Sequence, residues 1–273
     1  MTRSKGLSFL LPGFCGVMIF YFIPFVDVIR RSFVQAVSGS FCGFDNYRMV
    51  LSNTAFRLAV RNTARFVLVC LPLLLLLSLG LALLVNRWQI GTVKMVYLIP
   101  MAIPAASVVL LWQLLFDRQG FVNHILNLCG IPAVGWMDTK ASFDVLVFSY
   151  IWKNLGYTMI LWLAGLASVP VSVYEAAQMD GAGKCVQFFR ITLPLIRPMI
   201  FTIVVLSFLN SFKVFREAYL VAGNYPQEDI YLLQHLFNNW FVELSVDKMA
   251  AGSVLLALVI AATVLVLQKL WEQ

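Results

Sequence analysis

Two groups of polar side chains interrupt long apolar stretches of this sequence. Tyr150, Lys153, Asn154 and Tyr157 are separated by three or four residues, so a helix would place them on one face. Aromatic rings can stack on the apolar face of a sugar, and amide or amine groups can bond its hydroxyl groups. This face is therefore a candidate path for a polar solute. The alternative is that Lys153 extends to a water-facing edge and Asn154 bonds a neighbouring helix.

The second group lies in a later apolar stretch and contains Asn210, Ser211 and Lys213. Polar residues inside an apolar stretch that crosses a membrane are costly, so they indicate a binding or pathway role. We expect this group to lie at a depth similar to that of the first, which would let both contribute to one path.

The sequence shows no residue pattern of an enzyme or a metal site. No pair of carboxylates, and no serine or cysteine with a histidine, is arranged for catalysis. His124 and His235 stand apart from other metal ligands, and the five cysteines have no metal-binding spacing. The phosphate-binding pattern Gly-x-x-x-x-Gly-Lys-Ser/Thr is missing. We therefore expect a protein that is not an enzyme, holds no cofactor or metal, and does not bind ATP through such a loop.

The composition indicates an all-α polytopic membrane protein. Hydrophobic residues make up 61% of the 273 residues and charged residues only 12%, which is unusual for a soluble domain. The net charge of +7 does not gather in a soluble domain and so does not indicate nucleic-acid binding. A helix needs about 20 apolar residues to cross a membrane. Residues 1–273 are predicted to form a single transmembrane domain with six spans, at 7–28, 62–86, 95–116, 145–169, 195–214 and 250–269.

A polar segment interrupted by glycines, residues 170–194, separates the fourth and fifth spans. Ser172 and Glu175 have capping-box spacing, which predicts a helix that begins near Val173. Asp180 and Gly181 are typical turn residues and should end that helix. A second short helix is expected over about residues 185–191. The segment is therefore predicted to form a helix-turn-helix outside the membrane core.

The same segment resembles the EAA motif of binding-protein-dependent ABC transporter permeases, in the branch that contains maltose-type and glycerol-3-phosphate-type permeases. In that family the motif is the coupling helix that docks into a groove of a cytoplasmic ATPase. The resemblance implies that Ala176 and Ala177 are buried against that ATPase. The implied ATPase-coupling residues are Glu175, Ala176, Ala177, Asp180, Gly181, Ala182, Leu193 and Pro194.

Two shorter stretches add to the resemblance. Asn62 and Thr63 stand where the family has an Asn-Thr pair, and residues 116–136 resemble a family loop with Gly-x-x-Asn and a later Trp. The resemblance also implies three partners: a second homologous permease, an ABC ATPase dimer that binds the ATP, and an extracytoplasmic solute-binding protein.

Counted from Glu175 without gaps, the first polar group falls on positions where the maltose-type permease lines its sugar site. Asn210, Ser211 and Val214 fall on such positions as well. Tyr157 keeps the residue type of that family member, whereas Lys153, Ser211 and Val214 do not. The resemblance therefore implies a sugar or sugar-like solute that differs from maltose, and Lys153 would suit an anionic group.

The expected location is the plasma or inner membrane, with both chain termini in the cytoplasm. Six spans place the termini on one side, and the resemblance places residues 170–194 on that same side. The distribution of positive charge conflicts with this orientation: eight Lys or Arg residues fall on the inner side and eleven on the outer side, whereas inner loops normally carry the excess. Three of the eleven, Arg57, Arg61 and Arg65, form an amphipathic stripe before the second span.

Two other functions are compatible with parts of the sequence. The first is a permease of the same superfamily for a non-sugar solute, such as glycerol-3-phosphate or a glycerophosphodiester. The second is a secondary transporter, which would be expected to have carboxylates within its spans and an internal repeat. The sequence shows neither of these two features.

Overall fold

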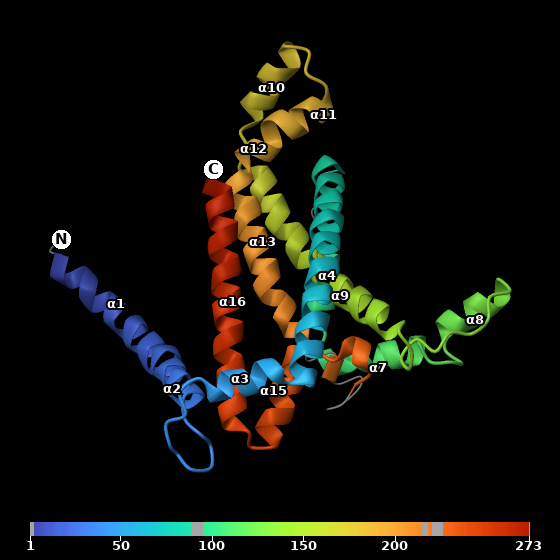
Figure 1. Cartoon of the computed structure of the whole chain (residues 1–273). Coiled ribbons are helices and arrows are strands. Elements are labelled where there is room, and N and C mark those ends of the chain that lie inside the picture. Colours follow the sequence, from blue (N-terminus) through green and yellow to red (C-terminus); the bar gives the residue numbers. More distant parts are fainter. Residues whose placement is uncertain (1–2, 89–94, 215–217, 220–225, 273) are drawn as a thin grey trace. The chain divides into compact units, whose positions relative to one another are not determined.

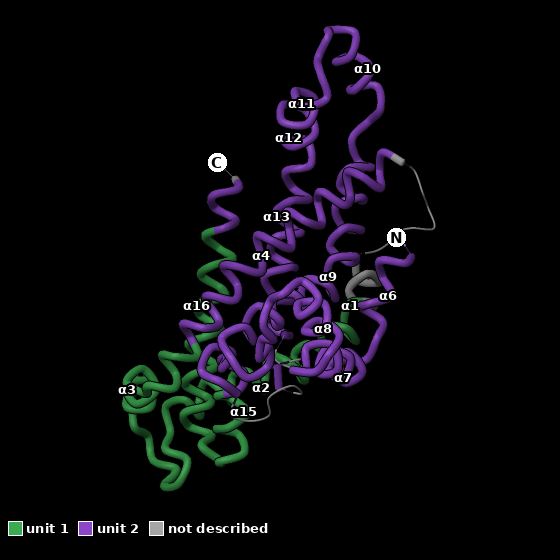
Figure 2. Tube along the Cα trace, turned by 90° about the vertical axis from the view of Figure 1, so that its right-hand side faces the viewer, with its two compact units in different colours: residues 1–59, 236–266 green, residues 60–235, 267–273 purple. Residues whose placement is uncertain are grey.

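The computed structural model describes residues 3–88, 95–214, 218–219 and 226–272. Within these ranges the chain is helical, with one isolated β-bridge between Val34 and Phe41 and no strand. The predicted all-α class is confirmed. Contacts divide the chain into two compact units, coloured separately in Figure 2. Unit 1 comprises Met1–Ala59 and Leu236–Val266, and unit 2 comprises Val60–His235 and Leu267–Gln273.

Unit 1 contains the N-terminal helices and much of the last two helices. They are α1 (Arg3–Val17), the π-helix η1 (Met18–Phe22), α2 (Ile23–Ser32), α3 (Asp45–Ser52), the start of α4 (Thr54–Trp88), most of α15 (Leu233–Val242) and most of α16 (Val246–Glu272). The buried amide of Asn46 fixes the turn between α2 and α3, because it donates to the carbonyl oxygens of Ser32 and Val34. Phe56 and Trp240 stack with their ring centroids 6.3 Å apart.

Unit 2 contains the remaining helices (Figure 1). They are the rest of α4, α6 (Ile99–Ala102), α7 (Ala105–Leu115), α8 (Phe121–Leu128), α9 (Ser142–Ala167), α10 (Val171–Met179), α11 (Lys184–Gln187), the π-helix η2 (Phe188–Thr192), α12 (Leu193–Leu195), α13 (Arg197–Ser211), and the 3-10 turns η3 (Phe212–Val214) and η4 (Glu228–Ile230). α4, α9 and α13 supply most of its two buried apolar clusters. Trp162 joins α9 to α4, since its indole N–H donates to Ser78 Oγ at 3.0 Å.

Four described helical segments are long and apolar enough to cross a membrane, and a fifth results if α9 and α10 count as one bent span. The four are Leu10–Ser32, Thr54–Arg87, Arg197–Val214 and Val246–Trp271. α9 and α10 meet at an angle of 65°. The six-span arrangement therefore stays a prediction.

The expected third span, residues 95–116, is not one continuous helix. α6 ends at Ala102 and α7 begins at Ala105. Between them Ile103 is extended, with ψ of 130°, because the ring of Pro104 disfavours helical backbone in the preceding residue. The expectation of one continuous span over residues 95–116 is therefore corrected.

Two π-helical turns also reflect prolines. η1 ends two residues before Pro24, and η2 ends two residues before Pro194. A proline lacks the N–H that would bond the carbonyl four residues earlier, and its ring crowds that carbonyl. A wider turn just before the proline accommodates both effects.

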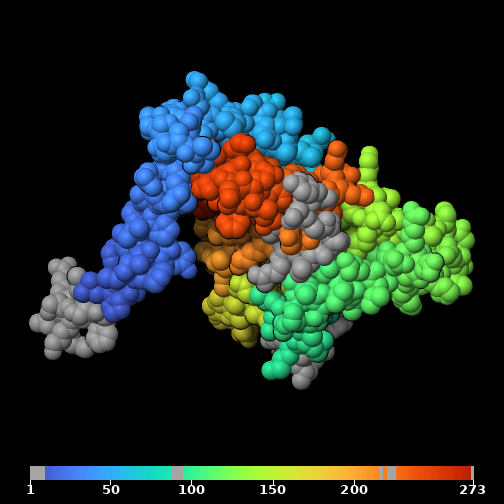
Figure 3. All heavy atoms as spheres, turned by 90° about the horizontal axis from the view of Figure 1, so that it is seen from below, coloured from blue at the N-terminus to red at the C-terminus, as the bar shows by residue number. Residues whose placement is uncertain are grey.

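Residues 116–136 form an arm that projects from unit 2 around α8, shown in green in Figure 3. The side chain of Asn123 is fully buried at its base. Its amide donates to the carbonyl oxygens of Asp117 and Val134, and its Oδ1 accepts from the N–H of Val134 and from the indole of Trp136. The Asn and Trp noted in the sequence therefore have a structural role, which is to close this loop.

Candidate functional site: the coupling hairpin and the polar face of α9

Residues 170–196 form a hairpin, here called the coupling hairpin, that extends beyond the ends of α9 and α13 (Figure 1). Its first helix, α10, ends at Met179, and Gly181 follows with φ of +78°. The N–H of Gly181 donates to Gln178 O at 3.0 Å, and the N–H of Ala182 donates to Ala177 O at 2.9 Å. These two bonds form a Schellman motif, which needs a left-handed residue at the position of Gly181. The predicted turn is confirmed.

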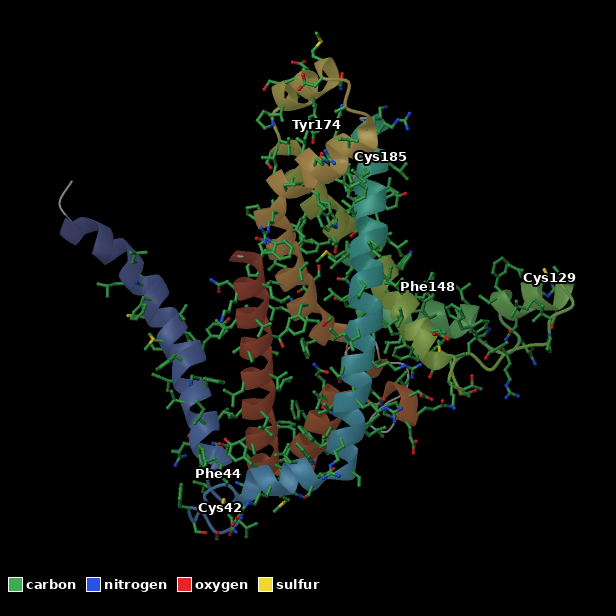
Figure 4. All side chains as sticks on the ribbon, turned by 45° about the horizontal axis from the view of Figure 1, so that its top comes forward. Cys42, Phe44, Cys129, Phe148, Tyr174 and Cys185 are labelled. Atoms are coloured by element: carbon green, nitrogen blue, oxygen red, sulfur yellow. The ribbon has the colours of Figure 1, made fainter. Side chains whose placement is uncertain are left out.

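Three polar side chains make hydrogen bonds within the coupling hairpin, and one of these bonds joins its two arms. The hydroxyl groups of Tyr174 on α10 and Thr192 on η2 lie 2.9 Å apart. Thr192 Oγ1 also donates to Gln187 O, and Gln187 Nε2 donates to Ala182 O at 2.8 Å. Thr192 and Gln187 are buried. Figure 4 labels Tyr174 and Cys185, one from each arm. The hairpin thus holds its shape through its own hydrogen bonds.

The start of α10 differs from the prediction. The helix begins at Val171, directly after Pro170, and no side chain caps its N-terminus. Ser172 and Glu175 therefore do not form a capping box, because both lie inside the helix. The backbone of Pro170 is extended, with ψ of 137°, which ends the preceding turn and lets the helix start two residues earlier than expected. The second helix also differs, since α11, η2 and α12 follow one another without a gap from Lys184 to Leu195.

The two alanines of the motif face different environments. Ala177 is only 9% exposed within the chain itself, whereas Ala176 is exposed. The chain itself already covers the side chain of Ala177, and the burial of the two alanines against an ATPase stays a prediction. The residues that face outward are larger and apolar: Met179 is 89% exposed, Phe189 65% and Val186 45%. The coupling hairpin presents an apolar surface to its surroundings.

The polar face of α9 is less open than its sequence suggests. Tyr150 is 5% exposed and belongs to an apolar cluster with Phe66 of α4 and Val214 of η3. The rings of Tyr150 and Phe66 meet edge to face, with centroids 5.5 Å apart. The structure thus brings two of the predicted path residues, Tyr150 and Val214, into one cluster, but this cluster is packed core rather than the wall of an open path.

The remaining path residues fall into two sets. Lys153, Asn154, Tyr157 and Asn210 are partly exposed, and Ser211 is buried. Asn154 Nδ2 donates to Tyr150 O at 2.9 Å, and Ser211 Oγ donates to Phe208 O at 2.6 Å, so both are engaged within their own helices. Lys213 Nζ donates to Asn210 Oδ1 at 2.8 Å. The partly exposed set is the part of the predicted path that a solute could still contact.

Close backbone packing explains a glycine on the same helix. A Cβ atom on Gly156 would lie 1.8 Å from the carbonyl oxygen of Tyr97, a distance that no side chain can accept. Gly156 therefore lets the segment before α6 pack directly on α9.

A second group of hydrogen bonds secures the opposite end of unit 2. Asn62 Nδ2 donates to the carbonyl oxygens of Glu228 and Tyr231, and Thr63 Oγ1 accepts from the N–H of Leu233 at 3.1 Å. The Asn-Thr pair noted in the sequence therefore fastens residues 228–233 to α4. Arg65 adds to this attachment, since it contacts Asp229 at 3.4 Å and its guanidinium lies 4.0 Å from the ring centre of Phe143.

His235 is fully buried beside this attachment and stacks on Tyr231. Its Nδ1 accepts the N–H of Leu232 at 3.2 Å. Burial lowers the pKa of His235 from 6.5 to about 4, and a hydrogen bond with the backbone of Ala218 opposes this shift in part. The imidazole is therefore neutral near pH 7 and acts as a structural residue.

Sequence reasoning missed Tyr174, Gln187 and Thr192 as the residues that hold the coupling hairpin together. Each is a polar residue in a short segment with apolar neighbours, which is a weak signal. Among the described residues, no three potential ligands gather as a metal site.

Comparisons with known proteins identify the family. The family described as "Binding-protein-dependent transport system inner membrane component" matches residues 74–272. A trehalose/maltose transport system permease protein of Thermococcus litoralis is 31% identical over 81% of this chain and 78% of its own length. A sulfoquinovosyl glycerol transport system permease protein of Agrobacterium fabrum is 30% identical over 82% and 76%. An sn-glycerol-3-phosphate transport system permease protein of Salmonella typhimurium is 31% identical over 96% and 93%.

The fold has a close counterpart among solved structures. A bacterial ABC transporter involved in the import of the acidic polysaccharide alginate contains a chain that superposes with a TM-score of 0.84, at 23% identity, over 97% of this chain and 94% of that chain. The predicted resemblance and the multi-pass membrane class are therefore confirmed, and a secondary transporter is not favoured. The protein is a transport component rather than an enzyme, and it belongs to the family of binding-protein-dependent transport system inner membrane components.

Proposed function

We propose that this chain is the permease subunit of an ABC importer that moves a sugar or sugar-like solute across the cell membrane. An extracytoplasmic binding protein would deliver the solute, and a second homologous permease would complete the pathway. Family membership and the named solutes of several relatives support this proposal. The observation that carries it is the coupling hairpin, a self-supported projection with an exposed apolar surface.

The coupling hairpin is proposed to dock on a partner ATPase dimer, which would bind and hydrolyse the ATP. Met179, Val186 and Phe189 supply apolar area for such a contact, since all three are exposed. Gly181 would set the angle of α10 through its left-handed backbone, and Ala177 would support the helix from inside. This assignment places the hairpin, and with it both chain termini, in the cytoplasm.

The solute path is proposed to run along Lys153, Asn154, Tyr157 and Asn210. These side chains are partly exposed, and they combine a ring that can stack on a sugar with amide and amine groups that can bond hydroxyls. Tyr150 and Val214 would support the path from the packed core, and Ser211 would do so from α13.

An anionic solute such as glycerol-3-phosphate is the second candidate. It is favoured by one residue, Lys153, which lies between Tyr150 and Tyr157 on the same helix, and by the sn-glycerol-3-phosphate permease among the relatives. Uptake in proteoliposomes of labelled maltose, trehalose and glycerol-3-phosphate, each with its binding protein, would separate the two candidates. A Lys153→Ala variant should lose uptake of the anionic solute and retain most uptake of a neutral sugar.

Cysteine crosslinking tests the docking contact. In the assembled importer, Met179→Cys should crosslink to a cysteine in the groove of the ATPase, and the partner should protect it from a water-soluble thiol reagent. Ala177→Cys is the matched control, because the chain itself covers that position. Labelling of Met179→Cys from outside intact cells would contradict both the docking contact and the orientation.

A further inference from the structure

A cavity of about 520 Å³ lies in unit 2 at the base of the coupling hairpin, and none of the predicted path residues of α9 lines it. It is formed where α12 and α13 meet the C-terminal end of α16 (Figure 1). Its lining combines one cation with aromatic, proline and amide side chains: Pro194, Arg197, Pro198, Phe201, Gln268 and Trp271.

The aromatic wall of this cavity is held by direct contacts. The indole N–H of Trp271 donates to the backbone carbonyl of Arg197 at 2.7 Å. The guanidinium of Arg197 lies 5.7 Å from the centre of the Trp271 ring, within range of a cation–π contact. The ring of Phe201 lies near that of Trp271, with ring centroids 6.2 Å apart. The cation is therefore placed beside an apolar surface.

Arg197 keeps its charge available for a ligand. Its side chain is exposed, and among the residues that the structure describes no carboxylate lies within ion-pair distance of it. A guanidinium can bind phosphate oxygens through two parallel hydrogen bonds, which gives it a preference for phosphate over neutral groups.

The cavity lies at the ends of two segments that are long and apolar enough to cross a membrane. The apolar segment Arg197–Val214 begins at the cavity, and the apolar segment Val246–Trp271 ends there. Tryptophan and arginine are typical of the zone where hydrocarbon gives way to headgroups. A small soluble anion would leave the apolar walls of the cavity uncovered, whereas a phospholipid would cover them with its acyl chains.

We infer that this cavity binds the headgroup of an anionic phospholipid. Arg197 binds the phosphate, Trp271 positions Arg197, and the acyl chains lie along Phe201 and the two prolines. This inference goes beyond the proposed function and does not depend on which solute is carried. Inorganic phosphate shares the headgroup chemistry, so the experiment must separate the lipid from the free ion.

Contact quenching of tryptophan fluorescence provides the test. The full-length protein is reconstituted in phosphatidylcholine vesicles that contain either brominated phosphatidylglycerol or brominated phosphatidylcholine at equal mole fraction. Brominated chains quench only tryptophans that they touch, so excess quenching by phosphatidylglycerol reports its preferred binding. Arg197→Gln should reduce this preference about tenfold, as expected when the charge-assisted hydrogen bonds to one phosphate group are lost. Arg197→Lys should retain part of it.

A folding defect in Arg197→Gln could imitate the expected loss of lipid preference, so the variant and its control are chosen to exclude this. Arg197→Gln keeps the backbone carbonyl that Trp271 bonds, so the wall of the cavity remains. The matched control is Arg87→Gln, an exposed arginine in the last turn of α4 that does not line the cavity. Its preference should equal that of the unchanged protein.

Four outcomes would overturn the inference. They are equal quenching by both lipids, an unchanged preference in Arg197→Gln, an equal loss in Arg87→Gln, and displacement of the brominated phosphatidylglycerol by inorganic phosphate. The third would indicate general surface charge, and the fourth a site for the free ion. None of them depends on transport, so failure here would leave the proposed function untouched.

Discussion

The coupling hairpin and the opposite, packed end of unit 2 use polar residues in opposite ways. In the hairpin, the side chains of Tyr174, Gln187 and Thr192 make hydrogen bonds within the hairpin itself, while apolar residues such as Met179 face outward. At the packed end, Tyr150 lies in an apolar cluster, and Asn62 and Thr63 bond a chain segment that crosses over α4. The first arrangement leaves a surface for a partner, whereas the second uses nearly all of its residues for the fold.

This difference teaches how to interpret polar residues in an apolar chain. A polar residue in the packed end more often holds two chain segments together than contacts a solute. Tyr150 and Tyr157 are both tyrosines of α9 with similar sequence signals, yet the first is buried and the second is partly exposed. Substitutions in the two regions should therefore fail in different ways.

The largest effect is expected from Tyr150→Ala. Removal of a fully packed aromatic side chain costs about 3–5 kcal/mol, so the variant should unfold at a lower temperature in detergent. Tyr157→Ala should keep the stability of the parent and instead reduce solute uptake per ATP hydrolysed, since a lost solute contact costs about 1–3 kcal/mol. Unchanged uptake in both Tyr157→Ala and Lys153→Ala would contradict the proposal that the solute path runs along α9.

The next effect is a pH dependence that is confined to the packed end. Folding lowers the pKa of His235 from 6.5 to about 4, so the unfolded chain binds the proton more tightly. The stabilisation is complete above pH 6.5 and is lost as the pH falls from 6.5 towards 4, up to about 3 kcal/mol. Thermal unfolding of the purified protein between pH 4.5 and 7.5 measures it.

His235→Asn is the control for this dependence. It removes the titrating group, so its stability should vary less over the same pH range, although it will be lower near pH 7. An identical pH profile in the variant would assign the effect to other groups. Crosslinking of the coupling hairpin should not change with pH over this range in either protein.

Gly181→Val tests the turn of the coupling hairpin. Valine is strained at φ of +78°, by about 1–3 kcal/mol, so α10 should lose its orientation. The variant should still insert in the membrane but should lose ATP hydrolysis that is stimulated by the loaded binding protein. Gly183→Val is the matched control, because Gly183 has φ of −65° and a Cβ atom added there would meet no atom within 4 Å. Normally stimulated ATP hydrolysis in Gly181→Val would contradict the proposed role of the hairpin in coupling.

The smallest effect is expected from Tyr174→Phe. This change removes one hydrogen bond to Thr192 and retains the ring, which costs about 1 kcal/mol. Transport and ATP hydrolysis should be uncoupled slightly rather than lost, and faster hydrogen exchange in residues 184–192 should accompany the change. Thr192→Val should cost more than Tyr174→Phe, because it also removes the hydrogen bond to Gln187 O. The double variant should cost little more than Thr192→Val alone, because both changes remove the bond between the two hydroxyl groups. Full additivity would show that the two hydroxyl groups act separately.

The sequence alone determined the class of the protein and the position of the coupling hairpin. Long apolar stretches allow only helices, because backbone groups in a membrane must bond within their own segment. The turn at Gly181 was also predictable, since few residues other than glycine adopt a left-handed backbone at low cost. These features depend on neighbours in the chain and so are visible in local sequence.

Only the tertiary structure decided which residues of each element face the core. Ala176 and Ala177 are identical in type and adjacent, yet only Ala177 is buried, and the same holds for the contrast between Tyr150 and Tyr157. The bond between Tyr174 and Thr192 and the cavity at Arg197 depend on residues that lie apart in the sequence. The burial of a side chain depends on which element packs against it. The sequence periodicity of one helix does not show which element that is.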